Sequence, residues 1–384
     1  MSAVMIKSFT IEGFRKFESI TFDGLGKINL FLGNNNAGKT TILEAIYAFT
    51  CGDNIQQLVS TSVQRHAGTY NVYSFMEKLV NVFNDRDFLP LRFSLSATMD
   101  DDSNKKIVHE LHPEQIFADL EPTLMGSFGS NQSNEIWERN YPKYLGEWAI
   151  RYKSHDHDYT KRIKMPYPLR PRYLKEINPD MVYEQPMIRA RFVDVVTHRN
   201  REENFKIYSF LKREKKGKNM AEFVAELSRS FVDIAGIDCI PYPDGEMGPI
   251  SFMTQNDGML PIYSFGEGMQ RWYNILGGMI VYQDSIHCIE EVDATFHPQA
   301  QKQLASNLVR YAEKYNNQLF LTSHSQEFVD NLLETVYGNE EEVTEDHIRV
   351  ITLWHNPKLN KVQVRVLTGK EAYDMRDDFQ MELR

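Results

Sequence analysis

The sequence predicts an α/β fold with a mixed sheet, split by an α+β insertion, and three observations support this prediction. Apolar strands alternate with amphipathic helices at both ends of the chain. A glycine-rich loop joins one such strand to one such helix, and the regular pattern loosens in the middle of the chain. We therefore predict a first lobe over 1–100, an insertion over 101–185 and a second lobe over 186–384.

The first lobe begins with two stretches of alternating apolar residues, 5–11 and 20–22, which predict strands. The apolar run 28–32 predicts a buried strand, and a glycine-rich turn follows it. In 41–49 the apolar residues recur at helical spacing. Strand, loop and helix therefore follow one another in the order of a phosphate-binding unit.

The central part of the chain, from about residue 67 to residue 185, has little periodicity beyond a possible helix at 72–83 and two predicted strands at 91–99 and 107–111. Proline, aromatic and charged residues dominate the rest of it. Such sequence is poor core material, so we interpret it as an insertion.

The second lobe restores the alternation of strands and helices, which indicates a sheet covered by helices. The predicted elements are a strand at 188–196, a helix at 219–234, a strand at 286–289, a helix at 298–315, a strand at 318–321 and a closing hairpin of 349–353 with 362–366.

Composition places the chain among ordinary globular proteins, because 42% of its residues are hydrophobic and 25% are charged. It has no apolar run of about 18 residues that would span a bilayer, and its first residues lack an apolar signal core. The three cysteines are far apart in the sequence, which favours neither a disulfide framework nor a zinc site. We therefore expect a cytoplasmic protein with no membrane partner.

Charge is unevenly distributed along the chain. The formal net charge is −10, yet residues 151–218 contain 18 Lys and Arg against 9 Asp and Glu, a local excess of +9. This excess is compatible with a polyanionic partner such as DNA, although a charge run is more often a solvated face.

The glycine-rich loop fits the pattern G-x-x-x-x-G-K-[ST] and has the strand and helix that this pattern requires on either side. Its glycines let the backbone wrap around phosphate oxygens, Lys39 reaches the β and γ phosphates, and Thr40 offers a hydroxyl to Mg²⁺. The loop therefore predicts ATP and Mg²⁺ as ligands. The predicted nucleotide-binding residues in it are Gly33, Asn34, Asn35, Asn36, Ala37, Gly38, Lys39, Thr40 and Thr41.

Two adjacent acids, Glu290 and Glu291, end the buried strand 286–289. Alternation sends their side chains to opposite sides of the strand, so they can have different roles. We predict that Glu290 joins Thr40 in holding Mg²⁺ and that Glu291 is the catalytic base that orients and deprotonates the attacking water. The other interpretation is a strand that runs into a solvated acidic turn.

Two further segments combine polar residues with an adjacent predicted element. Ser264 lies in a serine and glycine turn before an apolar helix, where its hydroxyl and the backbone amides suit a phosphate, although a plain helix cap fits this segment equally well. His324 follows a buried strand, at the strand end where open α/β sheets bind ligands.

Together these motifs resemble the ABC-type ATPases of the SMC, RecF and OLD-like group, and the resemblance implies an ABC-type P-loop ATPase head. In that family the Ser264 segment, with Gly266, Glu267 and Gly268, is the signature motif, which contacts the γ-phosphate held by a second subunit. The resemblance further implies that Arg15 approaches the nucleotide, that Asp293 belongs to the D-loop at the dimer interface, and that His324 is the catalytic switch histidine. Glu290 stands where the family more often has aspartate. The glutamine loop has no unique position, since Gln56, Gln57 and Gln64 all qualify.

The partners that follow from the resemblance are a second copy of the chain, as a homodimer closed around ATP or a higher homo-oligomer, and a separate effector protein. Compact ATPases of this kind resemble the sensor subunits of bacterial anti-phage systems, which implies a Toprim-like nuclease as the effector and DNA or a DNA mimic as the trigger. Two alternatives remain open. One is a DNA-binding repair ATPase that uses Lys161, Arg162, Lys164, Arg170 and Arg172 with Tyr167 and Tyr173, and the other is a non-catalytic scaffold gated by ATP.

Overall fold

The computed structural model describes residues 5–62, 79, 81–85, 89–113, 146–155, 157–165, 178, 188–213, 218–231, 234–242, 248–338, 347–356 and 361–376. The chain forms two compact units. One comprises 1–5, 24–43 and 189–384, and the other comprises 6–23 and 44–188. Helix α1 (Lys39–Cys51) contributes residues to both units.

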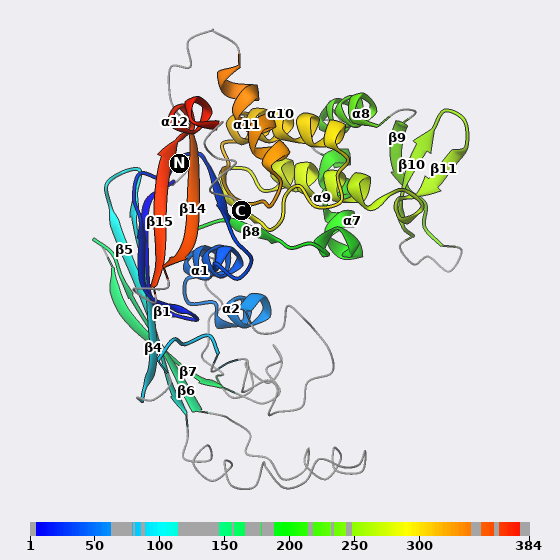
Figure 1. Ribbon diagram of the computed structural model, residues 1–384. Helices are drawn as coiled ribbons and strands as arrows, with labels where there is room; N and C mark the ends of the chain where they lie inside the picture. Colours follow the sequence, from blue (N-terminus) through cyan, green and yellow to red (C-terminus); the bar gives the residue numbers. More distant parts are fainter. Residues whose placement is uncertain are drawn as a thin grey trace, which may run out of the picture. The chain divides into compact units, whose positions relative to one another are not determined.

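The first unit is built on a six-stranded mixed sheet in the order β15-β14-β3-β13-β12-β8 (Figure 1). The five strands from β14 to β8 are parallel, and β15 pairs with β14 in antiparallel orientation. The strands are β3 (Ile28–Gly33), β8 (Ala190–Val193), β12 (Ile286–Ile289), β13 (Gln318–Thr322), β14 (Ile348–Asn356) and β15 (Lys361–Thr368).

Six helices belong to the described part of this unit beyond α1, and most of them pack around the buried helix α9. Residues 269–280 of α9 are all buried, which requires neighbours on every side of this apolar helix. The helices are α7 (Arg201–Arg213), α8 (Lys218–Ser230), α9 (Glu267–Val281), α10 (Pro298–Lys314), α11 (Gln326–Tyr337) and α12 (Gly369–Asp374).

A small antiparallel sheet also belongs to the first unit and lies beyond the helices, away from the six-stranded sheet (Figure 1). Its order is β11-β10-β9, from β9 (Ile234–Cys239), β10 (Ile250–Thr254) and β11 (Gly258–Pro261). The apolar side chains of β10 join the core that the helices share, since Phe252 contacts the ring of Tyr273 in α9.

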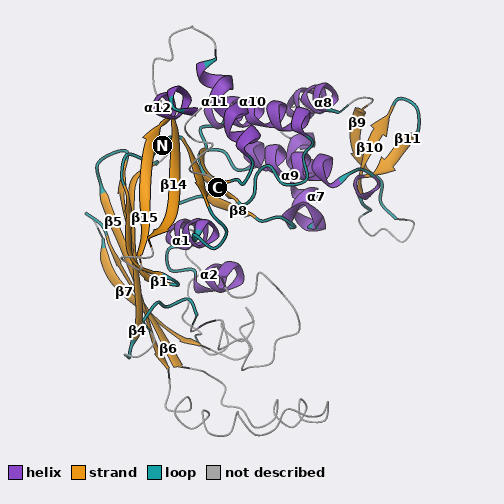
Figure 2. Ribbon diagram, viewed as in Figure 1, coloured by secondary structure: helices purple, strands orange, loops and turns teal. Residues whose placement is uncertain are grey.

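The second unit is a six-stranded antiparallel sheet in the order β2-β1-β4-β5-β6-β7, seen as the strands at the lower left in Figure 2. Its strands are β1 (Ile6–Phe14), β2 (Phe17–Phe22), β4 (Leu91–Met99), β5 (Asn104–Pro113), β6 (Gly146–Lys153) and β7 (Asp158–Met165), and helix α2 (Ile55–Ser62) belongs to the same unit. The ring of Phe9 in β1 meets that of Phe49 in α1 at 5.5 Å. One face of this sheet is therefore a hydrophobic core.

The predicted α/β class with a mixed sheet is confirmed, and most predicted elements lie where the sequence placed them. The predicted strand 286–289 coincides with β12, and the predicted strand 91–99 coincides with β4. The predicted helix 219–234 ends earlier, at Ser230, and Ile234, its predicted last residue, begins β9 instead. The predicted helix 298–315 corresponds to α10.

The stretch that the sequence suggested was poor core material is not uniformly so, and this expectation was wrong for β6 and β7. Trp148 and Ile150 in β6 are fully buried, and Ile163 and Met165 in β7 have at most 1% of their surface exposed. Of the described residues of the predicted insertion, 104–113, 146–153 and 158–165 form strands that extend the sheet of β1 and β4. The units therefore divide at other residues than the predicted lobes, because pairing joins the N-terminal strands to the insertion.

Candidate nucleotide-binding site

The carboxyl ends of the parallel strands of the first unit lie at one edge of the sheet and carry the predicted motifs. Strand β13 lies between β3 and β12, and in the strand register Leu321 is opposite both Leu30 and Ile289. The glycine-rich loop after β3, the acids after β12 and the histidine after β13 are thus brought to the same edge, where open α/β sheets bind ligands.

The glycine-rich loop has a backbone that its sequence makes possible. Gly33 has φ +132°, and a Cβ there would lie 2.2 Å from the carbonyl oxygen of Leu353, so no side chain fits. Asn36 has φ +65°, a conformation that asparagine tolerates better than most residues. The loop closes with a 3.1 Å hydrogen bond from the amide of Ala37 to the carbonyl of Asn34, and α1 then begins at Lys39.

The side chain of Lys39 folds back into the loop and is 6% exposed. Its Nζ donates hydrogen bonds of 2.6 Å to the carbonyl of Gly33 and 3.2 Å to that of Asn34. The ammonium group therefore lies at the mouth of the loop, beside the N-terminus of α1, where both the charge and the helix dipole favour an anion.

Thr40 and Glu290 meet across β13. The Oγ1 of Thr40 donates a 2.5 Å hydrogen bond to the Oε1 of Glu290, whose side chain is 8% exposed. A hydroxyl and a carboxylate supply oxygen ligands of the kind that Mg²⁺ binds, and two protein ligands leave room for phosphate oxygens and water. These two residues therefore fit a Mg²⁺ site.

Hydrogen bonds of the backbone fix the position of Glu291. It has φ +44°, its amide donates a 2.8 Å hydrogen bond to the Oγ1 of Thr322, and the next amide, of Val292, donates to the carbonyl of Thr322 at 2.9 Å. The sequence analysis gave Thr322 no role. The signal was present, because a threonine at the end of a buried strand needs a hydrogen-bond partner nearby.

His324 lies at the carboxyl end of β13 with an exposed side chain. Ser323 beside it is buried, and Ser325 caps α11 by accepting a hydrogen bond from the amide of Phe328. The histidine is therefore presented at the sheet edge by two fixed neighbours.

The signature segment forms a turn before α9. Ser264 is the last residue of a short 3-10 helix (Ile262–Ser264), and Gly266 is the N-cap of α9. Ser264, Gly266 and Glu267 are exposed. Glu267 is hydrogen-bonded to the guanidinium of Arg199, and this bond lowers the pKa of the carboxyl group. The turn thus offers a hydroxyl and helix amides to solvent.

Arg271 in α9 connects this turn to the acids. Its Nη2 donates one hydrogen bond to the carbonyl of Glu290 and another, of 2.7 Å, to the carbonyl of Glu291, and its side chain is fully buried. Sequence reasoning gave Arg271 no role. A charge within an otherwise apolar helix is a usable signal, because a buried arginine must find acceptors.

Arg15 belongs to the second unit and forms a 2.7 Å ion pair with Glu44 of α1. It has φ +50°, its amide donates to the carbonyl of Val82 at 2.7 Å, and its carbonyl accepts from the Nδ2 of Asn84 at 2.7 Å. These contacts hold the turn between β1 and β2 in one conformation. The role of Arg15 at the nucleotide stays a prediction.

Several residues of the basic segment are engaged with carboxylates. Lys161 pairs with the buried Asp53 at 2.7 Å, and Arg162 is hydrogen-bonded to Glu147. The described part of the segment is therefore less available to a polyanion than its composition suggested. Arg170, Arg172, Tyr167 and Tyr173 lie outside the described residues.

Of the three glutamines considered for the glutamine loop, Gln57 donates a hydrogen bond to the hydroxyl of Tyr47. Gln56 lies in α2, and Gln64 is outside the described residues.

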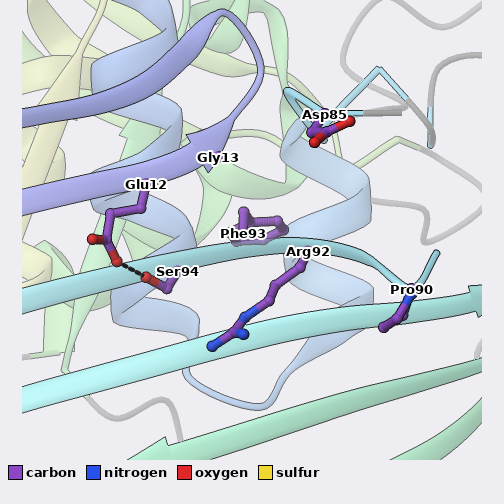
Figure 3. Close-up of a pocket in the computed structure, with 7 residues that line it drawn as sticks. All are labelled: Glu12, Gly13, Asp85, Pro90, Arg92, Phe93 and Ser94. Carbon is purple, nitrogen blue, oxygen red and sulfur yellow. Dashed lines mark hydrogen bonds between the residues drawn. The ribbon is translucent and has the colours of Figure 1, made fainter. Parts of the chain in front are cut away.

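A pocket of about 250 Å³ lies in the second unit, beside the turn between β1 and β2 (Figure 3). Glu12, Asp85 and Arg92 are among its lining residues, and the carboxylate of Glu12 accepts a hydrogen bond from Ser94 there. Its volume is below the roughly 300–1,000 Å³ usual for sites of small organic ligands. It does not contain the glycine-rich loop.

In the part of the chain that the structure describes, no three or more His, Cys, Asp and Glu side chains gather as a metal cluster, and no helix is long and apolar enough to cross a membrane. The three cysteines are free thiols.

Comparisons with protein families agree with this site. Residues 5–116 match the family described as "AAA ATPase domain", and residues 171–330 match the family described as "AAA domain, putative AbiEii toxin, Type IV TA system". The first match contains the glycine-rich loop, and the second contains the signature segment, both acids and His324. Both families are described as AAA domains, each matches less than half of the chain, and together with the glycine-rich loop they support a P-loop ATPase.

Among individual proteins, the chain is similar to the "ATP/GTP phosphatase" of Helicobacter pylori (strain ATCC 700392 / 26695), with 24% identity over 372 residues, covering 86% of this chain and 88% of the relative. Among solved structures it is similar to an SMC head bound to the C-terminal winged-helix domain of ScpA, with 11% identity, coverage of 96% of this chain and 99% of that one, and a TM-score of 0.48. The SMC head domain from Thermotoga maritima gives 11% identity, coverage of 95% and 98%, and a TM-score of 0.46.

Proposed function

We propose that the protein is an ABC/SMC-like ATPase that closes as a homodimer around two ATP molecules and uses the closed state to control a separate effector. The observation that carries the proposal is the bond between Thr40 and Glu290, which joins the glycine-rich loop to the acids of β12 in the same unit. With Lys39 held at the mouth of the loop, this arrangement supplies charge for the phosphates and oxygen ligands for Mg²⁺.

Each residue at the sheet edge has a distinct role in the proposed hydrolysis. Mg²⁺, held by Thr40 and Glu290, would neutralise charge on the β and γ phosphates. Glu291 orients a water molecule and takes its proton as the oxygen attacks the γ-phosphorus in line with the leaving group. His324, exposed at the end of β13, hydrogen-bonds the γ-phosphate and so reports whether it is present.

The exposed turn before α9 supports the dimer. Ser264 and Gly266 face solvent, and no Cβ placed at Gly266 would meet an atom within 4 Å, so the start of α9 is open to a ligand from outside the unit. A helix N-terminus with a free hydroxyl beside it suits a phosphate group. In the proposed dimer this phosphate is the γ-phosphate on the partner subunit's loop, with the Asp293 region crossing the same interface.

The regulatory part of the proposal places the protein in anti-phage defence, as the sensor subunit of a two-component system similar to the ATPase of the PARIS system. Its effector would be a Toprim-like nuclease, and its trigger would be DNA or a DNA mimic. The family description that mentions a toxin system is compatible with a defence role.

Replacement of Glu291 by Gln tests the catalytic part. The amide keeps the size of the side chain but cannot accept the proton from water, so ATP hydrolysis should fall by about 10²-fold or more while ATP still binds. The variant should accumulate as an ATP-bound dimer in size-exclusion chromatography with light scattering. Glu313→Gln, an exposed acid on α10, is the matched control and should behave as the unmodified protein.

Two other results would contradict the proposal. Unchanged hydrolysis and oligomeric state in the Glu291→Gln variant would favour the non-catalytic scaffold. A protein that stays monomeric with ATP and Mg²⁺ in both forms would overturn the composite dimer.

A further inference from the structure

Arg271 occupies an unusual position for a charged side chain. It is 0% exposed, and its Nη2 is hydrogen-bonded to two backbone carbonyls, those of Glu290 and Glu291, rather than to a carboxylate. Burial lowers the pKa of the guanidinium group. Four acidic side chains nearby act in the opposite direction and raise this pKa: Asp293, Glu291, Asp194 and Glu267. The group therefore remains charged inside the unit.

Stability alone does not explain this arginine. Among the described residues the Nε and Nη1 of Arg271 have no hydrogen-bond partner, and neither does the buried Oδ1 of Asp293. Buried polar atoms without partners are rare in folded proteins, and an apolar side chain of similar volume often stabilises a fold as well as a buried charge does. A feature that costs stability in this way is typical of a functional position.

The two carbonyls belong to the residues whose side chains perform the proposed chemistry. Glu291 has φ +44°, a conformation that few residues other than glycine adopt without support. Arg271 provides part of that support, and Thr322 provides another part, because its hydroxyl accepts from the amide of Glu291 and its carbonyl accepts from the amide of Val292. The carboxylates of Glu290 and Glu291 therefore take their positions from a backbone that α9 holds in place.

We propose that Arg271 is a positioning residue that couples the signature turn to the catalytic acids of the same subunit. It lies in the second turn of the helix that Gly266 caps, so any displacement of the turn before α9 moves the guanidinium and with it the backbone of Glu290 and Glu291. This inference rests on the proposed function. It adds a link between the two sites of the proposed dimer. When the signature turn of one subunit binds the nucleotide on the partner subunit's loop, the rate of hydrolysis at the first subunit's own loop changes.

Arg191 offers a matched control within the same unit. It is also buried, at 5% exposure, and it also holds α9, through hydrogen bonds of 3.1 Å to the carbonyl and 2.6 Å to the side chain of Asn274 and an ion pair of 2.9 Å with Glu203. None of these contacts is with Glu290 or Glu291. Loss of either arginine weakens the packing of α9, but only loss of Arg271 releases the acids.

The experiment compares Arg271→Met, Arg271→Lys, Arg191→Met and Arg191→Lys for ATP binding with Mg²⁺, for kcat and for thermal unfolding. We expect Arg271→Met to lower kcat by about tenfold or more with ATP affinity changed by less than about threefold, because small misplacements of catalytic groups cost this much. Arg271→Lys should recover part of kcat, since an ammonium can still donate to both carbonyls. The Arg191 variants should lose thermal stability but keep kcat while folded.

Equal losses of kcat in the Arg271 and Arg191 variants at matched thermal stability would overturn the inference, and so would full activity of Arg271→Met. If the Met variants do not fold, the Lys pair gives the same comparison. A double-mutant cycle with Ser264→Ala tests the coupling. The coupling is supported if Ser264→Ala lowers kcat in the unmodified protein and lowers it much less in the Arg271→Lys variant. Additive losses contradict the coupling.

The two proposals fail in different ways. A Ser264→Ala variant with unchanged kcat and unchanged oligomeric state contradicts the composite dimer, whatever Arg271 does. A normal response to Ser264→Ala with no difference between Arg271 and Arg191 contradicts only the role of Arg271.

Discussion

The hydroxyl of Thr40 donates a 2.5 Å hydrogen bond to the carboxylate of Glu290, a residue 250 positions further along the chain. The bond exists because β13 is added to the sheet between β3 and β12, although it follows both in sequence. A glutamate reaches the threonine at a position where aspartate, one methylene shorter, is the commoner residue of the family that the motifs resemble. The metal site proposed here therefore depends on the length of this side chain.

Removal of either Mg²⁺ ligand should raise the Mg²⁺ concentration that hydrolysis requires. Glu290→Gln can still accept the bond from Thr40 but loses the negative charge, so we expect metal affinity or activity to fall by at least about tenfold, the scale seen for groups that orient metal ligands. Thr40→Ala should act in the same direction, and Thr40→Ser should not. ATPase rates measured against Mg²⁺ concentration test this. Identical Mg²⁺ curves for Glu290→Gln and the unmodified protein would contradict the assignment.

Gly33→Ala should abolish nucleotide binding and destabilise the first unit. The new Cβ would lie 2.2 Å from the carbonyl oxygen of Leu353 in a backbone of φ +132°, so the loop or β14 must move, at a cost of about 2 kcal/mol or more. Gly258→Ala is the matched control, because it also has positive φ, +74°, but has nothing within 4 Å of the new Cβ, and about 1–2 kcal/mol is expected there. Urea denaturation and ATP binding of both variants test the difference. Normal ATP binding by Gly33→Ala would refute it.

Stability should fall as the pH drops below about 6.5. Burial lowers the pKa of His109 and of His287 from 6.5 to about 3. Between these values the unfolded chain binds a proton on each ring and the folded chain does not, so the stability that is complete above pH 6.5 is lost toward pH 3. The expected slope is about 1.4 kcal/mol per pH unit for each histidine.

The variant His109→Asn separates this titration from other acid effects. Its side-chain oxygen can still accept the bond that the Nε1 of Trp148 donates to the Nδ1 of His109 at 3.2 Å, but it does not titrate. The free energy of unfolding should be measured with denaturant between pH 7.5 and pH 5. Its dependence on pH should be weaker in this variant, by the contribution of one proton. An unchanged slope would show that His109 does not contribute.

Reversal of two exposed charges on β7 should weaken any binding of DNA as the polyanionic trigger. Arg162 and Lys164 are exposed, although Arg162 also pairs with Glu147, whereas Lys161 pairs with the buried Asp53 and is left unchanged to protect the fold. Arg162→Glu with Lys164→Glu should reduce the dependence of log affinity on log salt by about two units, because each lost phosphate contact removes about one. Fluorescence anisotropy with duplex DNA at several salt concentrations measures this.

The control for the DNA experiment is Lys302→Glu with Lys361→Glu, which changes the charge equally at exposed positions of the first unit. Absence of DNA binding by the unmodified protein at low salt would remove DNA as the trigger and also the repair ATPase as an alternative. Equal loss of binding in both double variants would show that only net charge matters.

The sequence could predict those parts of the site that depend on local chemistry. The segment from Gly33 to Thr41 needs small residues and a lysine at fixed spacing, and in the structure it runs from the last residue of β3 into the first turn of α1, in the predicted order of strand, loop and helix. The short apolar run before Glu290 is long enough only for a buried strand, and it forms β12 without change. These features depend on a few neighbouring residues, so periodicity and motif spacing reveal them.

The sequence could not predict which strands that are distant in the chain pair with one another. Pairing of β1 with β4 and of β4 with β5 joins the N-terminal strands to the predicted insertion. Trp148 and Ile163 become core residues there although the surrounding composition argued against it. Side-chain alternation shows which face of a strand is buried but not which strand is its neighbour.

The sequence by itself therefore determined the α/β class, the glycine-rich loop, the acids after a buried strand and the histidine after the next one. Only the tertiary structure decided that Thr40 meets Glu290, that Arg15 pairs with Glu44, and that Arg271 is buried against the backbone of the acids. The physical reason is that each of these contacts depends on the order of strands and the packing of helices. Both are set by the burial of a shared core, to which residues from the whole chain contribute.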